Sequence, residues 1–309
     1  MENKKVKTLF KYIGGKAWLK EQLREEINYL VKQKKPSTYV EPFTGGLGAF
    51  LSVYDILLNG GVKTIILNDI NYKLINFYKI VANSPEILIE EYIKLEKQFA
   101  ESIPKEANGL HPIKDKIKLK KLLINAEIFF KNVRNSFNNE KDINKSASQL
   151  LFLQKHCFNG VYRENLSGQY NTPFNWDAKS FSEEQIKEKI LDVNKVFKNF
   201  EMIFSIGSFE HLEYKEESLY YLDPPYINQD LIENKYNKDA FGVDKQKLLI
   251  EKISRVPFVY SNHDNDLLLS EFKEKVNKFK VKKIPRKNII SASTESRKND
   301  KIEILVTSE

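Results

Sequence analysis

Residues 38–69 read TYVEPFTGGLGAFLSVYDILLNGGVKTIILND, and this stretch decides the fold. Residues 38–40 form a short β-prone run, and residues 63–67 (KTIIL) form a second one. Between them, residues 49–59 carry apolar side chains at helical spacing and stop at the glycine pair 60–61, a typical helix-ending signal. A strand, a helix and a second strand in this order make a βαβ unit, which predicts a parallel sheet.

The remaining chain divides into a helical stretch and a second set of strands. Residues 73–195 have mostly helical periodicity, with loop-like segments at 103–116 and 165–176. Strand-like runs then return, at residues 202–206, 219–222, 258–261, 279–284 and 302–307. The last two suit an antiparallel closing pair. The sequence therefore predicts an α/β fold in which residues 1–72 and 196–309 build the sheet domain and residues 73–195 form a mainly helical insert.

The composition limits the class of protein. The chain has 309 residues, enough for two domains, and no apolar run reaches the roughly 20 residues that span a bilayer. The N-terminus lacks the apolar segment of a secretory signal, so we expect a cytoplasmic protein without membrane partners. Cys157 is the only cysteine and the four histidines lack metal-ligand spacing, so we expect no disulfide and no bound metal. The net charge of +8 suits a nucleic acid, but a lysine-rich composition alone leaves this open.

A glycine-rich turn follows the first strand, in the run EPFTGGLG at residues 41–48. Glycines between a strand and a helix let the backbone approach a ligand and point helix N–H groups at it. Asp69 ends the next strand, 21 residues after Gly48, where a doubly wound fold places a carboxylate for a ribose diol. A tight structural turn is the alternative, and the spacing does not fit the G-x-G-x-x-G pattern of a dehydrogenase. The pair of features favours binding of a nucleoside cofactor.

The tetrapeptide Asp223-Pro224-Pro225-Tyr226 directly follows the strand-like run at residues 219–222. Two prolines stiffen the turn and fix the direction of the preceding carbonyl. A carboxylate and a carbonyl held in this way can both accept hydrogen bonds from one exocyclic amine, and the tyrosine offers a ring on which a base can stack. A structural turn remains the alternative for the tetrapeptide alone. Its position after a strand of an α/β sheet, downstream of the glycine turn, favours catalysis.

The ordered motifs resemble those of the Dam-type DNA adenine-N6 methyltransferases over nearly the whole chain. They are FKYIGGK (residues 10–16), the glycine turn, NDIN (68–71), CFNGVYR (157–163), YNTPF (170–174), DPPY (223–226) and SNHD (261–264). The resemblance implies a Rossmann-like S-adenosylmethionine-dependent methyltransferase sheet. It also implies that the helical insert at residues 73–195 is a DNA-recognition domain.

The resemblance implies a role for each matching position. Asp223 and the Pro224 carbonyl would hold the target N6, and Tyr226 would stack on an adenine flipped out of the duplex. Lys16 would lie near the carboxylate of S-adenosylmethionine, and Asp69 would bind its ribose. The full set implied for cofactor binding is Tyr12, Lys16, Glu41, Phe43, Gly45, Asp69, Ser208, Phe209 and Asp223.

The implied macromolecular partner is double-stranded DNA, and the implied contact residues are Phe158, Asn159, Arg163 and Pro173. Arg163 would read a base edge, with guanine as the usual bidentate partner, in a short site resembling GATC. Tyr12, Phe158, Val161 and Thr172 depart from residues found in part of the family, which leaves the recognition sequence open. A cognate restriction endonuclease that acts separately is a further partner that the resemblance allows.

Two other functions stay open at this point. An N4-cytosine DNA methyltransferase shares the chemistry, although Asp223 favours adenine over the Ser-Pro-Pro-Tyr that such enzymes often carry. A catalytically idle DNA-binding regulator could keep the fold, but the intact Lys16, Asp69, Asp223 and Tyr226 argue against it. A cytosine-C5 enzyme is disfavoured because Cys157 does not follow a proline.

Overall fold

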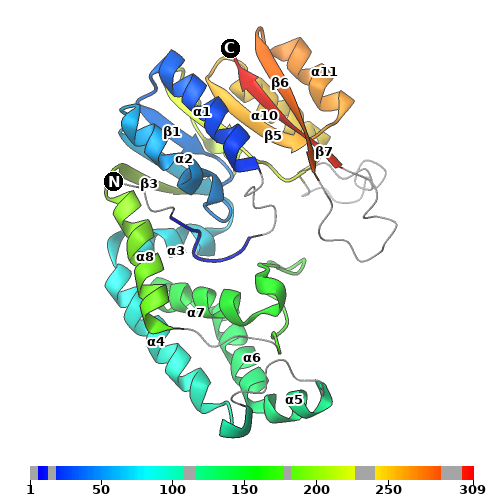
Figure 1. Ribbon diagram of the computed structural model, residues 1–309. Helices are drawn as coiled ribbons and strands as arrows, with labels where there is room; N and C mark the ends of the chain where they lie inside the picture. The colour runs from blue at the N-terminus through cyan, green and yellow to red at the C-terminus, as the bar shows by residue number, and fades with distance from the viewer. Residues whose placement is uncertain (1–5, 13–18, 108–115, 177–181, 227–240, 287–300) are drawn as a thin grey trace. The chain divides into compact units, whose positions relative to one another are not determined.

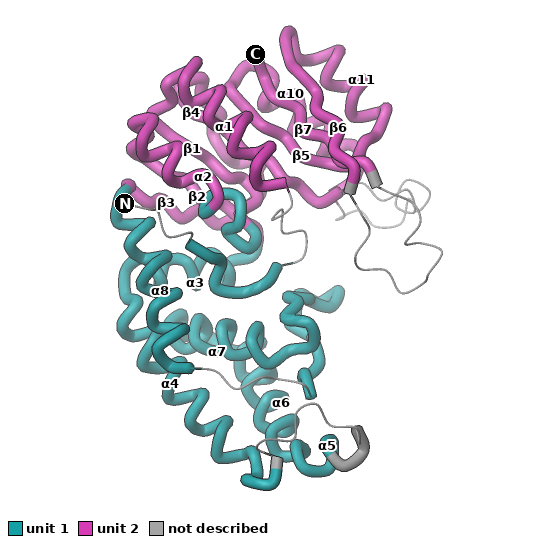
Figure 2. The backbone as a smooth tube through the Cα atoms, in the orientation of Figure 1, with its two compact units in different colours: residues 1–17, 45–51, 71–199 teal, residues 18–44, 52–70, 200–309 magenta. Residues whose placement is uncertain are grey.

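The computed structural model describes residues 6–12, 19–107, 116–176, 182–226, 241–286 and 301–309. The chain divides into two compact units, each assembled from separate stretches (Figure 2). Unit 1 consists of Met1–Ala17, Gly45–Leu51 and Asn71–Asn199. Unit 2 consists of Trp18–Thr44, Ser52–Ile70 and Phe200–Glu309, and it holds the sheet.

Unit 2 contains a seven-stranded sheet with the order β3-β2-β1-β4-β5-β7-β6 (Figure 1). The strands are β1 (Thr38–Glu41), β2 (Thr64–Asp69), β3 (Glu201–Ile206), β4 (Ser218–Leu222), β5 (Phe258–His263), β6 (Phe279–Arg286) and β7 (Lys301–Ser308). Strands β1 to β5 are parallel, whereas β7 is antiparallel to both β5 and β6. The predicted α/β fold and its antiparallel closing pair are confirmed. The insertion of β7 between β5 and β6 was not predicted.

The topology sets where a ligand can bind. The chain passes from β1 to β2, and later from β3 to β4, which lies on the other side of β1. The switch point of the doubly wound sheet therefore lies between β1 and β4, and ligands of such folds bind beyond the carboxyl ends of the strands at this point. Glu41 ends β1 and Asp223 follows β4, so two carboxylates of the predicted site lie at this switch point.

Burial accounts for the apolar character of β4. Every residue of β4 is buried, as expected for a parallel strand that is covered on both faces. The apolar core between sheet and helices includes Leu249 of α10 (Val243–Ile253), Phe272 of α11 (Asp266–Lys275) and Tyr260 of β5. The other helices with residues in this unit are α1 (Lys20–Lys34) and α2 (Gly48–Asn59), whose first turn belongs to unit 1.

The described part of unit 1 is mainly helical. Its helices are α3 (Tyr72–Asn83), α4 (Pro85–Glu101), α5 (Lys116–Leu122), α6 (Ile124–Asn139), α7 (Ile143–His156) and α8 (Glu183–Phe197). Helix α7 is buried along most of its length and packs against α3, α4 and α6. Three-residue 3₁₀ turns are η2 (Lys105–Ala107) and η3 (Phe158–Gly160), with η4 (Phe209–His211) in unit 2. Residues 108–115 of the predicted loop at 103–116 lie outside the described residues.

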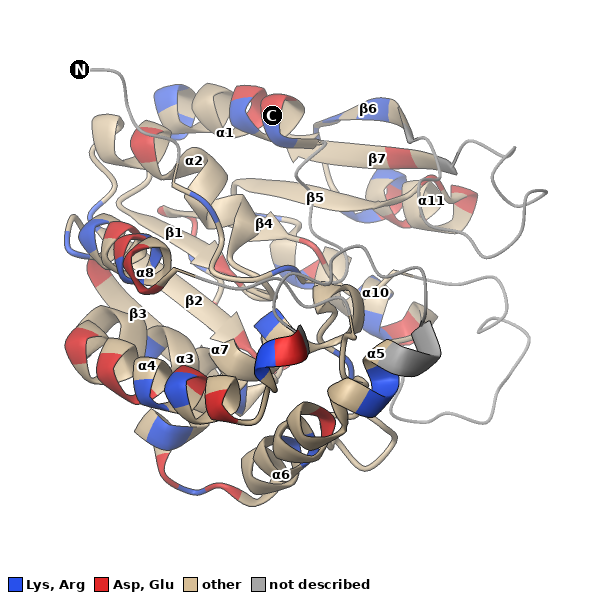
Figure 3. Ribbon diagram, turned by 60° about the horizontal axis from the view of Figure 1, so that its bottom comes forward, with Lys and Arg blue, Asp and Glu red and all other residues tan. Residues whose placement is uncertain are grey.

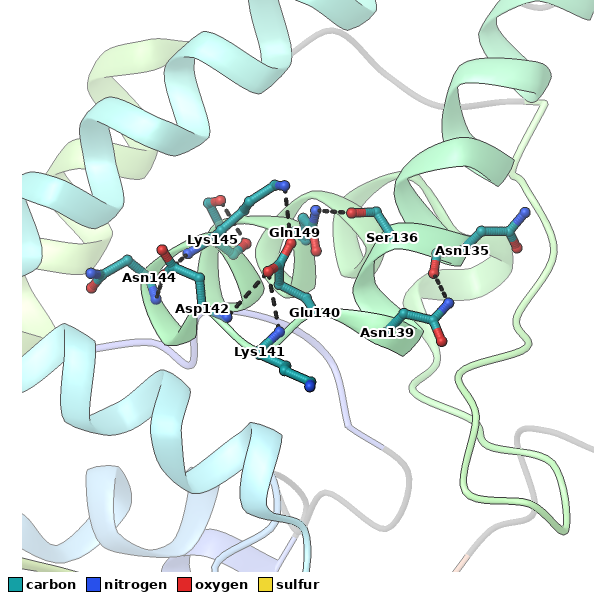
Figure 4. A network of polar contacts seen from close by, with 10 residues as sticks. Asn135, Ser136, Asn139, Glu140, Lys141, Asp142, Asn144, Lys145 and Gln149 are labelled. Atoms are coloured by element: carbon teal, nitrogen blue, oxygen red, sulfur yellow. Dashed lines mark hydrogen bonds and ion pairs between the residues drawn. The ribbon is translucent and has the colours of Figure 1, made fainter.

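A polar corner ends α6 and starts α7 (Figure 4). Asp142 caps α7 by accepting hydrogen bonds from the amides two and three residues further on, at 2.8 and 3.2 Å. Glu140 forms a 3.0 Å ion pair with Lys145. Gln149 donates to the Ser136 hydroxyl at 2.9 Å and so ties α7 back to α6. These contacts fix the start of the helix that leads into the motif CFNGVYR at residues 157–163.

Among the described residues, no helix is both long enough and apolar enough to span a membrane.

Candidate active site

The turn after β4 is held at three points by residues of unit 2. Ser261 of β5 donates to Asp223 Oδ1 at 2.9 Å, which fixes the direction of the carboxylate. Gln246 of α10 donates to the Pro225 carbonyl at 2.9 Å. The Tyr226 hydroxyl donates to Glu303 Oε2 at 2.9 Å. The turn is therefore anchored by hydrogen bonds at Asp223, Pro225 and Tyr226.

Tyr226 itself lies among acidic groups. Burial raises the pKa of Tyr226 far above its usual value, and the charges of Asp223 and Glu303 raise it further. The phenol therefore stays protonated and acts as a donor. Its ring meets the edge of His263 with a centroid distance of 4.5 Å and an interplanar angle of 73°.

A second cluster lies where β1, β2 and β3 end. The side-chain amide of Asn68 donates to the backbone carbonyls of Pro42 and Gly207 at 2.9 and 3.0 Å. The backbone carbonyl of Asn68 accepts from the Thr44 amide at 2.9 Å. These bonds tie the turns after β1 and β3 to the end of β2, where Asp69 is half-buried. The side-chain oxygen of Asn68 is buried and accepts no hydrogen bond from any described residue. The sequence motif NDIN includes both residues, but a cofactor role was predicted only for Asp69 and not for Asn68.

Aromatic rings border this cluster. Phe43, after β1, lies 5.6 Å from Phe209 and 5.4 Å from Phe241 between ring centroids. Ser208 accepts from the Glu210 amide at 3.3 Å and so caps the 3₁₀ turn that carries Phe209. Glu41 is buried and accepts a 2.8 Å hydrogen bond from the Tyr39 hydroxyl. Phe241 was not identified from the sequence because it follows no motif.

Tyr12 packs on the glycine turn within unit 1. Gly45 has φ +48°, in the left-handed region that favours glycine, and its carbonyl accepts from the Tyr78 hydroxyl at 2.7 Å. A Cβ atom on Gly46 would lie 2.5 Å from the Tyr12 Cβ. The Tyr12 ring also stacks on Tyr162, with centroids 5.8 Å apart. Lys16, the other residue expected in this element, lies outside the described residues.

The predicted DNA contacts lie on a hairpin-like arm, residues 157–174. Two antiparallel bridges, Cys157 with Phe174 and Glu164 with Tyr170, hold its two sides together. Cys157, Tyr162, Tyr170, Thr172 and Phe174 are buried and anchor the arm. Most of the residues between them are exposed, and Gly160, Val161 and Asn171 are half-buried.

All four predicted DNA-contact residues are on the outward side of this arm. Phe158 has a relative exposure of 54%, which is high for a large apolar residue, and Arg163 and Pro173 are exposed as well. Asn159 is exposed and has φ +57°, a left-handed conformation that asparagine tolerates. Asn171 accepts from the Arg163 Nε at 2.8 Å, which orients the guanidinium.

Basic side chains also occur on α5 (Figure 3). Lys120 and Lys121 are exposed in its last turn, and the Lys120 ammonium lies 5.7 Å from the ring centroid of Trp176, just beyond the arm. Within the described ranges, no group of three or more His, Cys, Asp or Glu side chains is arranged to hold a metal ion.

Comparison with known proteins shows the family to which the chain belongs. The family described as D12 class N6 adenine-specific DNA methyltransferase matches residues 12–289. A type II methyltransferase, M.MjaIII of Methanocaldococcus jannaschii, is 31% identical over 97% of this chain and 98% of its own length. The DNA adenine methylase of Serratia marcescens is 28% identical over 85% of this chain and 86% of its own, and that of Escherichia coli K12 is 27% identical over 85% and 83%. Neither the cytosine-N4 alternative nor the idle regulator is favoured by these relatives. The chain belongs to the D12 class of N6 adenine-specific DNA methyltransferases.

Proposed function

We propose that the reaction of this family, methylation of adenine N6 in DNA, takes place at the Asp223–Tyr226 turn of this chain. The observation that carries the proposal is the fixed direction of Asp223, whose Oδ1 accepts from Ser261 at 2.9 Å at the switch point of the sheet. A carboxylate held in advance needs no reorganisation when it accepts a hydrogen bond from the target amine. The N6 lone pair is conjugated with the ring, and acceptors on its hydrogens make the nitrogen more nucleophilic.

The family implies S-adenosylmethionine as methyl donor, and the residues present fit it. When bound, it supplies a methyl group attached to a positively charged sulfur. The half-buried Asp69 suits a ribose diol, and the rings of Phe43 and Phe209 offer an apolar surface for an adenine. The buried side-chain oxygen of Asn68 adds an acceptor at the same strand ends.

The remaining cofactor contacts in the proposal come from the N-terminal motif at residues 10–16, the glycine turn at residues 41–48 and the turn after β3. Tyr12 and Gly45 would bind the methionine part, and Lys16 would neutralise its carboxylate. Glu41, buried at the end of β1, would accept from its amino group. Ser208 would act by holding Phe209 in place.

We assign DNA recognition to residues 73–195. The outward Arg163, oriented by Asn171, suits the major-groove edge of guanine, because a planar fork matches O6 and N7. Phe158 and Asn159 suit the gap that a flipped base leaves, and Pro173 suits a thymine methyl. Exposed Lys120 suits a phosphate. A short GATC-like site, a cytoplasmic location and a separate cognate endonuclease belong to the same proposal.

The proposal is tested by replacing Asp223 with alanine. We expect methyl transfer to DNA to fall at least 100-fold, as for loss of a preorganised electrostatic contact, while binding of the duplex is retained. Exposed Glu274 on α11 supplies the matched control, since Glu274→Ala removes a carboxylate from the same unit. Labelled methyl groups that still reach DNA at a rate near that of the control would reject the catalytic assignment.

A further inference from the structure

Glu303 is a completely buried carboxylate near the start of β7. It lies opposite His263 of β5 in the antiparallel register. A buried carboxylate loses its hydration, so it is retained in a protein only where polar partners replace the lost water. Glu303 belongs to none of the sequence motifs, and it lies 77 positions from the residue that it contacts.

That residue is Tyr226, the last member of the motif. Its hydroxyl donates to Glu303 Oε2 at 2.9 Å, a charge-assisted bond that is stronger than one between neutral groups. The ring of Tyr226 also meets His263, the register partner of Glu303, at 4.5 Å between centroids. Two neighbouring strands therefore hold the ring at its far end and along its side.

This arrangement restricts the ring in a way that suits stacking. A tyrosine anchored by its backbone alone can turn about its first side-chain bond. Anchoring of the hydroxyl, at the opposite end of the ring, removes that freedom and leaves a ring face to present to a base. The phenol is the donor in this bond, because burial raises the pKa of Tyr226 far above its usual value and keeps the phenol protonated.

We propose that Glu303 is a positioning residue for methyl transfer: its carboxylate holds the Tyr226 ring in the orientation that stacks on the flipped adenine. The inference rests on the proposed role of the Asp223–Tyr226 turn. Glu303 does not touch the substrate, so its removal alters the holding of the extruded base and leaves the cofactor contacts of Asp69 in place.

The test compares Glu303→Ala, Glu303→Gln and Tyr226→Phe in the full chain. Single-turnover methyl transfer is expected to fall about 10- to 100-fold in Glu303→Ala and in Tyr226→Phe, the range for loss of a hydrogen bond to a charged group. The double variant is expected to lose little more than either single variant, because both remove the same bond. Glu303→Gln is expected to recover most of the rate, since its amide oxygen can accept from the same hydroxyl.

A second readout separates positioning from structure. In a duplex with 2-aminopurine in place of the target adenine, an extruded base fluoresces more strongly. Glu303→Ala is expected to change this signal, because the extruded base loses its fixed stacking partner, while the dissociation constant for S-adenosylmethionine changes less than about 3-fold. Thermal unfolding reports whether each variant is folded, and if Glu303→Ala is not, Glu303→Gln and Tyr226→Phe carry the test.

The outcomes distinguish the two proposals. Losses in Glu303→Ala and Tyr226→Phe that multiply in the double variant, or an unchanged 2-aminopurine signal in folded variants, overturn the positioning role. Asp223→Ala, measured in parallel, reports on the turn itself. If Asp223→Ala retains full activity, the proposed catalytic assignment fails regardless of Glu303. If it is inactive while Glu303→Ala and Tyr226→Phe are fully active, the inference about Glu303 alone is rejected.

Discussion

Replacement of Gly46 by alanine would create a steric clash with Tyr12, a residue that we assign to cofactor binding. The added Cβ would lie 2.5 Å from the Tyr12 Cβ and 3.2 Å from its ring carbon Cγ. Carbon atoms in contact normally stay about 3.5–4.0 Å apart. Tyr12 would therefore have to move by about 1 Å, and its stack on Tyr162 would be disturbed with it.

The structure sets the expected size of the effect. Overpacking of this kind costs about 1–3 kcal/mol, which corresponds to about 5- to 150-fold in a dissociation constant if the loss falls on the binding site. Tyr12 contacts both the glycine turn and Tyr162, which is a buried residue of the arm at residues 157–174. We therefore expect Gly46→Ala to weaken binding of both S-adenosylmethionine and DNA.

The assay is isothermal calorimetry with S-adenosylmethionine, followed by titration of duplex DNA. Gly48→Ala is the matched control, because its added Cβ would lie 3.9 Å from Thr8 Cγ2, an ordinary contact. Thermal unfolding of both variants shows whether the fold is kept. Equal cofactor affinities for folded Gly46→Ala and Gly48→Ala would refute the reasoning from Tyr12.

Three further outcomes are expected. Asp69→Ala should weaken S-adenosylmethionine binding about 10- to 150-fold, as for loss of a charge-assisted hydrogen bond, and unchanged affinity in a folded variant would remove the ribose assignment. Arg163→Ala should relax selectivity at one base pair of the methylated site, by about 1–3 kcal/mol, whereas an equal loss on all sites would make Arg163 a backbone contact. The free energy of unfolding should fall as the pH drops below 6.5, because burial lowers the pKa of His156 in the folded state. The Glu96 carboxylate, 2.8 Å away, raises this pKa, but burial has the larger effect. The folded state then binds fewer protons than the unfolded chain, so urea denaturation at pH 5 and pH 7.5 should show the difference, and His156→Phe should reduce it.

The sequence predicted well the positions of those residues that lie next to a predicted strand. Asp69 ends the strand-like run that follows the glycine turn, and Asp223 begins the turn after β4. Each lies within a few residues of the strand that positions it, so strand prediction also placed the side chain at the carboxyl edge of the sheet.

The partners of the site could not be predicted because they depend on long-range pairing. Ser261 reaches Asp223 across 38 positions, and Glu303 reaches Tyr226 across 77. Both contacts require β5 to lie beside β4, and the second requires β7 to lie beside β5 rather than at the edge of the sheet. No local pattern encodes that order.

The burial of polar residues in helix α7 could not be predicted from its sequence either. Its sequence contains the polar residues Ser148, Gln149 and Gln154, yet all three are buried. Gln149 donates to the Ser136 hydroxyl of α6, whereas the Ser148 hydroxyl donates to the Lys145 carbonyl within α7. The contact between the two helices depends on their packing, which the local sequence does not encode.

The most direct test of the central claim is the identity of the methylated nucleoside. DNA would be incubated with the protein and S-adenosylmethionine, digested to nucleosides and analysed by mass spectrometry, with Asp223→Ala as the inactive control. The account predicts N6-methyladenine as the product of the unaltered chain and its loss in the variant. N4-methylcytosine as the product, or no methylated nucleoside from the folded, unaltered protein, would contradict it.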